Sequence, residues 1–149
     1  MFDLNLPRYD FNIRSNEGKK QIFDALRKRF VALTPEEWVR QHFTRFLLEE
    51  KGFPGGRMIQ EACVLVNGLK KRCDTLVYDS NAKPLVLIEY KAPDVAITQQ
   101  VFDQIAAYNF ALNVEYLIVS NGVSHYCCKI VYDTHSMIYL EDIPSYLEL

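Results

Sequence analysis

Hydrophobic positions recur along the chain with two periods, one typical of helices and one typical of strands. Between Glu17 and about Leu33 apolar residues recur at helical spacing. This segment is predicted to form a short helix, or two turns that flank an extended piece. The first sixteen residues contain Pro7 and several aromatic side chains, and we expect an irregular arm or a short strand there.

A clear helix start follows at Thr34. Thr34 suits the N-cap, Pro35 the first helical position, and Glu37 the third position, where it completes a capping box. The helix is predicted to run to about Lys51, and Gly52 is typical of its end.

Strand-like segments dominate the rest of the chain. Asn67-Gly68 separates two of them and indicates a tight hairpin turn. The third segment, Pro84–Lys91, is apolar on both faces in its middle, as expected of a central strand. The predicted elements are strands at 59–66, 69–78 and 84–91, a helix at about 95–112, and strands at 116–120, 123–132 and 137–140. This order predicts one α/β domain over residues 1–149, with an N-terminal arm or helix at 1–33 and a core at 34–149 built on a mixed sheet.

Charge and composition exclude several classes of protein. The net charge of −2 means that any contact with DNA must depend on local basic clusters. The candidates, each of which also fits an ordinary solvated face, are Lys19-Lys20, Arg27-Lys28-Arg29 and Lys70-Lys71-Arg72. No apolar run is long enough to span a bilayer and the N-terminus lacks a signal peptide, so we expect a cytoplasmic protein without membrane partners. The four cysteines and three histidines lack zinc-site spacing, and we expect reduced cysteines.

Candidate chemistry lies at the end of the central strand. Glu89 and Lys91 share one strand face because residues two apart point the same way. A short turn joins this strand to the preceding one, so antiparallel pairing brings Asp74 close to Glu89. The two carboxylates would bind one hard cation such as Mg²⁺, and Lys91 would orient the attacking water or stabilise developing charge. Alternatively, Glu89 and Lys91 form an ordinary surface ion pair.

The helix that follows adds two polar candidates. Gln104 and Tyr108 are four residues apart and therefore share one helical face near the strand end. Tyr108 is equally consistent with core packing. Gln104 lies beside an apolar stripe, where an amide needs a partner.

Four motifs in this order resemble the N-terminal nuclease domain of type I restriction enzyme R subunits, within the PD-(D/E)xK nuclease superfamily. They are Arg72-Cys73-Asp74, Val86-Leu87-Ile88-Glu89-Tyr90-Lys91-Ala92-Pro93, Gln104-Ile105-Ala106-Ala107-Tyr108-Asn109 and Ile118-Val119-Ser120-Asn121-Gly122. The resemblance implies a restriction-endonuclease-like core.

The resemblance also implies roles for individual residues. Asp74 and Glu89 match the metal-binding carboxylates of the family, and Lys91 matches its catalytic lysine. Gln104 and Tyr108 match an element that positions DNA or supports the site. Glu37, with Glu36 beside it, matches a glutamate that many relatives place on the first core helix near the metal, although its capping role explains it equally well.

Two departures from the family limit what is carried over. Cys73 replaces the usual proline before the aspartate, and the chain has no G-x-x-x-x-G-K-[ST] loop. We therefore expect no ATP site and no DNA translocation by this chain, which is a free-standing relative or a fragment. The first hypothesis is an endodeoxyribonuclease that uses Mg²⁺, with Mn²⁺ as a substitute, and whose partners are DNA and either a second copy or other restriction-modification subunits.

Two alternatives stay open. The fold could be a catalytically weak or inactive module that binds DNA or a partner protein. It could also be a dimerising interaction domain in which the charged cluster is a structural ion pair.

Overall fold

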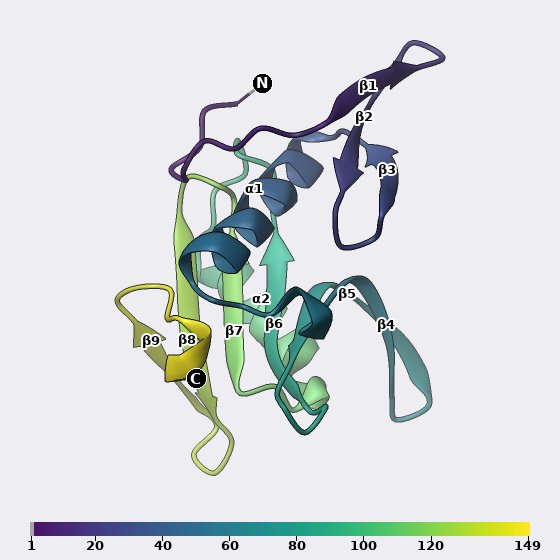
Figure 1. Ribbon diagram of the computed structural model, residues 1–149. Coiled ribbons are helices and arrows are strands. Elements are labelled where there is room, and N and C mark those ends of the chain that lie inside the picture. The colour runs from purple at the N-terminus through teal and green to yellow at the C-terminus, as the bar shows by residue number, and fades with distance from the viewer. Residues whose placement is uncertain (1) are drawn as a thin grey trace.

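An antiparallel three-stranded sheet, a mixed six-stranded sheet and two α-helices make up the described part of the protein (Figure 1). The computed structural model describes residues 2–149, apart from the side chains of Tyr108, Asn109 and Ala111. The first sheet has the order β1-β2-β3, and the second has the order β4-β5-β6-β7-β8-β9. The strands are β1 (Ile13–Asn16), β2 (Lys19–Asp24), β3 (Arg29–Ala32), β4 (Met58–Val66), β5 (Leu69–Tyr78), β6 (Pro84–Tyr90), β7 (Tyr116–Ser120), β8 (His125–Val131) and β9 (Ser136–Leu140). The helices are α1 (Pro35–Glu50) and α2 (Gln99–Asn109), with short 3-10 turns at Gly55–Arg57, Phe110–Leu112 and Tyr146–Glu148.

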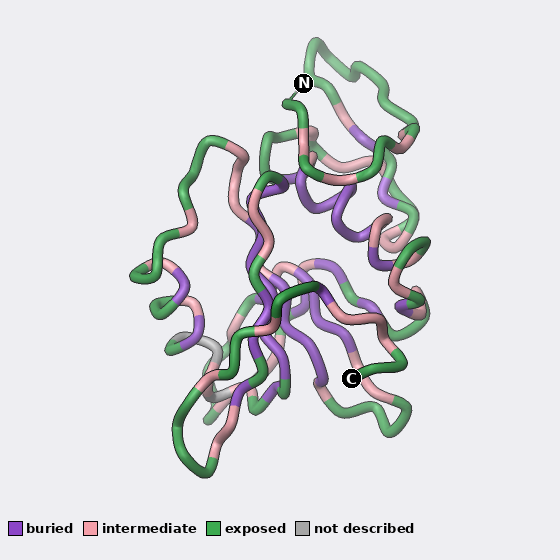
Figure 2. Tube along the Cα trace, turned by 90° about the vertical axis from the view of Figure 1, so that its left-hand side faces the viewer, coloured by how far each residue is buried: buried purple, intermediate pink, exposed green. Residues whose placement is uncertain are grey.

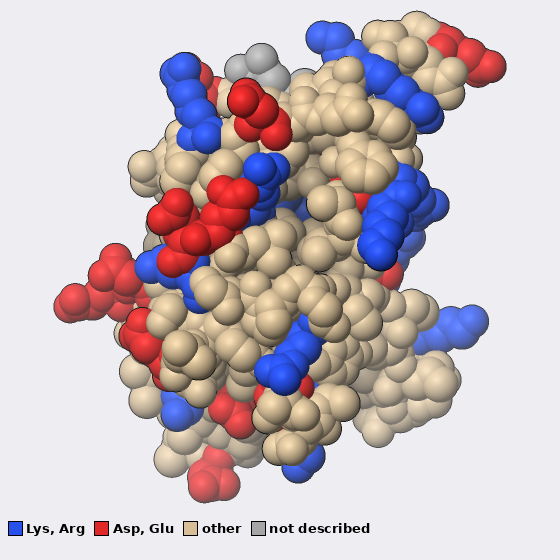
Figure 3. All heavy atoms as spheres, viewed as in Figure 1, with Lys and Arg blue, Asp and Glu red and all other residues tan. Residues whose placement is uncertain are grey.

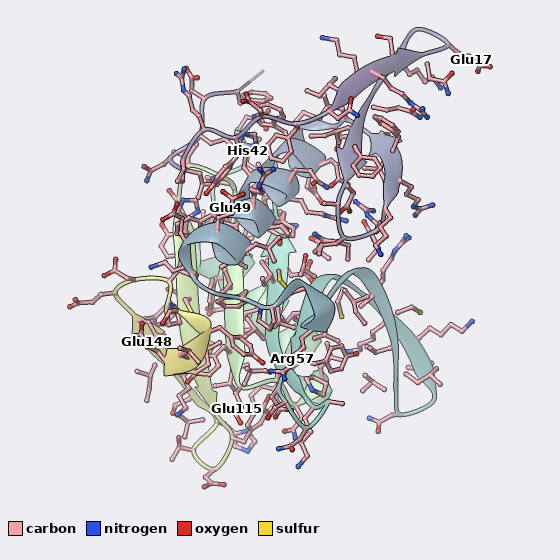
Figure 4. The ribbon with its side chains drawn as sticks, viewed as in Figure 1. Glu17, His42, Glu49, Arg57, Glu115 and Glu148 are labelled. Atoms are coloured by element: carbon pink, nitrogen blue, oxygen red, sulfur yellow. The ribbon has the colours of Figure 1, made fainter. Side chains whose placement is uncertain are left out.

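The N-terminal segment is a three-stranded antiparallel sheet, so the helix considered between Glu17 and Leu33 is wrong. The alternative of two turns flanking an extended piece is confirmed, because turns at 17–18 and 25–28 flank β2. Glu17 and Gly18 both have positive φ angles, which suits the tight turn of the β1–β2 hairpin. Figure 4 shows Glu17 at the tip of this hairpin, which projects from the body. The apolar spacing was misleading because Ile22 is buried from a strand, where its neighbour Phe23 faces the other side.

Helix α1 confirms the predicted start. The Thr34 side chain accepts a hydrogen bond from the backbone N–H of Glu37 at 3.0 Å, and Pro35 occupies the first turn. Thr34 is therefore the N-cap, as the sequence predicted. The helix ends at Glu50, next to the predicted end at about Lys51.

The six-stranded sheet confirms the mixed α/β core. Its strands pair antiparallel except for β6 and β7, which are parallel and are connected through α2. Asn67 and Gly68 both have positive φ and form the predicted β4–β5 turn. Strand β9 lies at one edge of the sheet and β4 at the other.

Each face of this sheet carries its own apolar cluster. Val39, Phe43 and Leu47 of α1 pack against one face, and Phe102 and Ala106 of α2 pack against the other. Figure 2 shows the buried stretches concentrated in these central strands and in α1. Strand β6 is covered by α1 on one face and by α2 on the other, and this packing fixes the position of its end.

Helix α2 begins later than predicted. Thr98 caps it, accepting a hydrogen bond from the N–H of Val101 at 3.2 Å, so the residues after Val95 form a loop rather than a first turn. No helix in the described part of the chain is long and apolar enough to cross a membrane.

Candidate active site

Strand β5 separates from β6 at Asp74. The last paired residues of the two strands at this end are Thr75 and Ile88. One step further, the Asp74 Oδ2 atom accepts a hydrogen bond from the backbone N–H of Tyr90 at 2.9 Å. The Asp74 carboxylate thus accepts a hydrogen bond from a backbone N–H at the point where the regular β5–β6 pairing ends. This bond places Asp74 beside the end of β6.

Glu89 lies next to Asp74, as the register predicted. Burial and then the negative charge of Asp74 raise the pKa of the Glu89 carboxyl above its usual range, while nearby Lys91 acts in the opposite direction. The Lys91 backbone N–H donates to the Ser120 carbonyl at 2.9 Å, which fixes the chain where it leaves β6. Asp74, Glu89 and Lys91 are therefore brought together, with an excess of negative charge that favours a bound cation.

Tyr90 points to the opposite face of β6. Its side chain is fully buried, and its hydroxyl lies 2.9 Å from Thr75 Oγ1 and 3.5 Å from Thr44 Oγ1. Burial raises the pKa of Tyr90 to about 12. Tyr90 therefore belongs to a buried polar network under α1, and it anchors the strand that carries the two charged candidates.

The helix glutamate nearest the cluster is Glu36. Partial burial and the charge of Asp74 raise the pKa of Glu36, whereas Lys91 and Arg40 act to lower it, so this exposed carboxyl faces the cluster. Glu37 is buried and accepts hydrogen bonds from Arg27 Nη2 at 2.8 Å and from Gln41 Nε2 at 3.0 Å. Its carboxylate is thus already engaged by neighbours.

A buried guanidinium connects the helix with Asp74. Arg40 has a side chain that is 4% exposed, and its Nη2 atom lies 2.8 Å from Glu61 Oε1 and 3.6 Å from Asp74 Oδ1. Its Nε atom lies 3.7 Å from Glu37 Oε2. Within the described residues, Nε and Nη1 have no hydrogen-bond partner. Arg40 therefore stabilises three carboxylates at once, and it orients Asp74 from the helix side.

Glu61 extends the row of acidic residues across the sheet. It lies between the pairs Gln60–Thr75 and Ala62–Cys73, opposite Asp74, and its φ angle is +53°. Such a conformation is uncommon for a non-glycine residue and is typical of constrained positions near functional sites. Arg40 and Arg72 hold the Glu61 carboxylate, and these bonds lower its pKa despite the opposing effect of burial.

The sequence suggested that the Gln104 amide lies beside an apolar stripe and needs a partner, and the structure does not support this reason. This residue is exposed on α2, whose buried face carries Phe102 and Ala106, so its amide needs no protein partner. The Tyr108 side chain lies outside the described residues. A role for either residue in supporting DNA stays a prediction.

The donor set fits a magnesium ion better than a metal that requires a full protein cage. Among the described residues, no group of three or more His, Cys, Asp or Glu side chains is arranged to hold a metal. Magnesium commonly takes one or two carboxylates and completes its coordination with water and phosphate oxygens. Asp74 and Glu89 supply that number, and their mutual repulsion is relieved by a cation.

Arg40 and Glu61 were missed by the sequence analysis. Arg40 is four residues after Glu36 on α1, and this spacing signals that the two side chains share a face. Glu61 lies in a strand whose pairing with Asp74 follows from the Asn67-Gly68 turn once the register is counted. Neither position has a motif that would have singled it out.

Comparisons with known proteins show the family and the fold of this chain. A family model described as the N terminus of type I restriction enzyme R proteins matches residues 35–144. A solved structure, described as a fragment of an HsdR subunit of a type I restriction enzyme from Vibrio vulnificus YJ016, matches with a TM-score of 0.51 and 20% sequence identity. The match covers 76% of this chain and 24% of that chain, so the chain spans about a quarter of its length. A comparison with curated proteins finds no match.

Proposed function

The chain belongs to the family of type I restriction enzyme R protein N-terminal domains, and from this premise we propose that it is a metal-dependent nuclease that hydrolyses phosphodiester bonds of DNA. The observation that carries the proposal is the meeting of Asp74, Glu89 and Lys91 where β5 separates from β6. Two adjacent carboxylates, of which Asp74 raises the pKa of Glu89, are suited with the neighbouring lysine to a cation and a phosphate.

Asp74 and Glu89 would hold the ion, with Glu36 facing them from the first turn of α1. We propose Glu36 for the helix position first assigned to Glu37, because Arg27 and Gln41 already engage Glu37. The ion, Mg²⁺ or Mn²⁺, would supply Lewis-acid activation of the reacting phosphate and of water when bound. The protein itself would hold the ligands Asp74 and Glu89 in fixed positions.

Lys91 would act on the reacting groups directly. It follows the last residue of β6, and its positive charge acts on Glu89 and Glu36, which supports this role. There it would orient the attacking water and stabilise the negative charge that develops on the phosphate. Gln104 would support the substrate strand from α2.

Arg40 and Tyr90 would act as positioning residues. Arg40 contacts Asp74 from the helix side, and the Tyr90 N–H holds the second carboxylate oxygen of Asp74. Fixing both oxygens of one ligand lowers the cost of organising the site for substrate. Proposed partners are DNA and other restriction-modification subunits or a second copy, in the cytoplasm.

One contact favours the alternative of a DNA- or protein-binding module with little cleavage. Arg40 lies 3.6 Å from Asp74, and its permanent charge competes with a cation for that carboxylate. In this reading the cluster is mainly an ion-pair network that holds α1 on the sheet.

A plasmid nicking assay separates the two functions. With Mg²⁺ or Mn²⁺ we expect the protein to nick supercoiled DNA, and we expect Asp74→Ala and Lys91→Ala to abolish nicking while both variants remain folded by circular dichroism. The exposed residues Asp133 and Lys129 provide matched controls, because Asp133→Ala and Lys129→Ala remove the same charges elsewhere. Undiminished nicking by Asp74→Ala would refute the proposed catalytic role, and metal-independent DNA binding without nicking would favour the alternative.

A further inference from the structure

Two β-structures that project from the same side of the body carry most of the exposed basic clusters (Figure 1). We call the sheet β1–β3 the upper arm and the hairpin of residues 62–73, from β4 and β5, the lower arm. The exposed basic residues of the upper arm are Arg14, Lys19, Lys20, Lys28 and Arg29, and those of the lower arm are Lys70 and Arg72. The proposed catalytic function uses none of them.

The upper arm is fixed next to the carboxylate cluster. Arg27 in the β2–β3 turn binds Asp24 on its own arm and Glu37 on α1, where Nη2 lies 2.8 Å from Oε1. Glu37 in turn contacts Arg40, the neighbour of Asp74. The turn is thereby held against the first turns of α1, while the next residues, Lys28 and Arg29, stay exposed. Lys28 has a φ angle of +55°, as a tight turn requires.

The lower arm starts at the cluster itself. Arg72 precedes Asp74 by two residues in β5, and its side chain is 76% exposed although Nε lies 2.8 Å from Glu61 Oε2. Arg72 pairs with Cys63 and Lys70 pairs with Leu65, so both basic residues lie on one face of the hairpin. The basic residues of the lower arm thus begin two residues before Asp74, and those of the upper arm follow Arg27, which is linked to Asp74 through Glu37 and Arg40.

Charge is distributed unevenly over the surface, and the basic clusters lie on the side that carries the two arms. The net charge is −2, so basic residues gathered in one region must be balanced by acidic residues elsewhere. Figure 3 shows Lys and Arg over the upper arm and along the right-hand edge, with Glu17 at the tip as an exception; Asp and Glu lie mainly on the left and at the bottom, where further Lys and Arg side chains are interspersed with them. A polyanion is therefore attracted to the side with the arms, although the carboxylates between them repel phosphate.

We propose that the two arms bind the phosphate backbone of duplex DNA on both sides of the carboxylate cluster, the upper arm through Lys28 and Arg29 and the lower arm through Lys70 and Arg72. Duplex DNA carries a negative charge about every 1.7 Å along its axis, so a duplex that lies across the cluster offers phosphates to each arm that it reaches. These contacts position the backbone without reading sequence. The inference rests on the proposed nuclease function for its choice of DNA, but binding itself needs neither metal nor cleavage.

Fluorescence anisotropy with a labelled 30-base-pair duplex in EDTA tests the arms without cleavage. The variants are Lys28→Ala/Arg29→Ala for the upper arm and Lys70→Ala/Arg72→Ala for the lower arm. The control Lys83→Ala/Lys129→Ala removes two exposed positive charges, one of them at the opposite end of β6 from Glu89. We expect each arm variant to weaken binding about tenfold and to lower the salt dependence by roughly two phosphate contacts, with the control near wild type.

The outcomes are distinct from those of the nicking assay. Loss of binding in the arm variants, together with a wild-type protein that never nicks, keeps the arms and refutes the nuclease. Nicking by a protein whose arm variants bind DNA normally refutes the arms and keeps the nuclease. Equal weakening in the control, no binding of duplex by the wild type, or tighter binding of the matching single strand would each overturn the inference.

Discussion

Replacing Glu89 with Gln is expected to stabilise the protein in the absence of metal. Burial and the charge of Asp74 raise the pKa of Glu89, so the ionised form is less favourable in the folded state than in the unfolded state. Between the ordinary glutamate pKa and the raised value, the folded state binds more protons than the unfolded state. The contribution of Glu89 to stability therefore falls as pH rises through this range, and a neutral glutamine lacks that loss.

The size of the effect follows from the pH window. Each pKa unit is worth about 1.4 kcal/mol, and the distance from an ordinary glutamate pKa of about 4.3 to pH 7 is roughly 2.7 units, so the ceiling at pH 7 is about 3.7 kcal/mol. Lys91 offsets part of this cost and Glu89 is only partly buried. We expect Glu89→Gln to raise the free energy of unfolding by about 1–2 kcal/mol at pH 7 and by close to zero at pH 4.

Urea denaturation in EDTA between pH 4 and 8 measures this difference. The matched control is Glu115→Gln, at an exposed glutamate just before β7, far from the end of β6 that carries Glu89 (Figure 4). The control should follow the wild type at every pH. If Glu89→Gln is less stable than the wild type at pH 7, or if its advantage does not grow with pH, the account of the Asp74–Glu89 pair is wrong.

The same variant tests metal binding by a second measurement. A cation that binds only the folded state stabilises it by an amount that rises with the logarithm of its concentration over its dissociation constant. Added Mg²⁺ should therefore raise the melting temperature of the wild type and of Glu115→Gln, and it should leave Glu89→Gln almost unchanged. An equal rise in all three proteins would locate the metal elsewhere.

Two further substitutions test the supports of the site. Arg40→Met should lower the free energy of unfolding by about 1–3 kcal/mol in urea, because Glu37, Glu61 and Asp74 each lose one charged partner while Arg27 and Arg72 still hold Glu37 and Glu61. Arg45→Met, at an exposed pair, should cost less than about 1 kcal/mol. A small loss for Arg40→Met would mean that the network does not hold the cluster. Tyr90→Phe should cost about 1–2 kcal/mol through the lost bond to Thr75, yet nicking should persist; lost nicking in a stable variant would assign the hydroxyl a direct role.

Patterns that depend on local chemistry could be predicted from the sequence. The Thr34 cap, the Asn67-Gly68 turn and the apolar run before Glu89 each have one physical reading, and all three agree with the structure. The turn at Asp79–Lys83 also indicated that the Asp74 region meets the end of β6. The register shift at Val77/Tyr78, which places Asp74 one step beyond the Thr75–Ile88 pair and so beside Glu89, had no signal in the sequence.

Features that depend on packing could not be predicted in the same way. Ile22 and Phe30 have helical spacing, but the segment is extended because β2 pairs with β1 and β3, and only Ile22 and Asp24 of these strands are buried. Whether Glu36 or Glu37 faces Asp74 depends on which one Arg27 engages, and Arg27 comes from another element. The exposure of Gln104 likewise reflects the rotation of α2 on the sheet.

Because the β5–β6 pairing ends at Asp74, the length of the lower arm does not determine the positions of the site residues. The site is fixed by the Gln60–Thr75 pair on one side and the Tyr90–Asp74 bond on the other, whereas residues 62–73 form a ladder of their own that ends at the Asn67-Gly68 turn. Removing or adding two residues on each strand of that ladder preserves which face each side chain takes. The hairpin can therefore be shortened or lengthened, in evolution or by design, without moving the carboxylates.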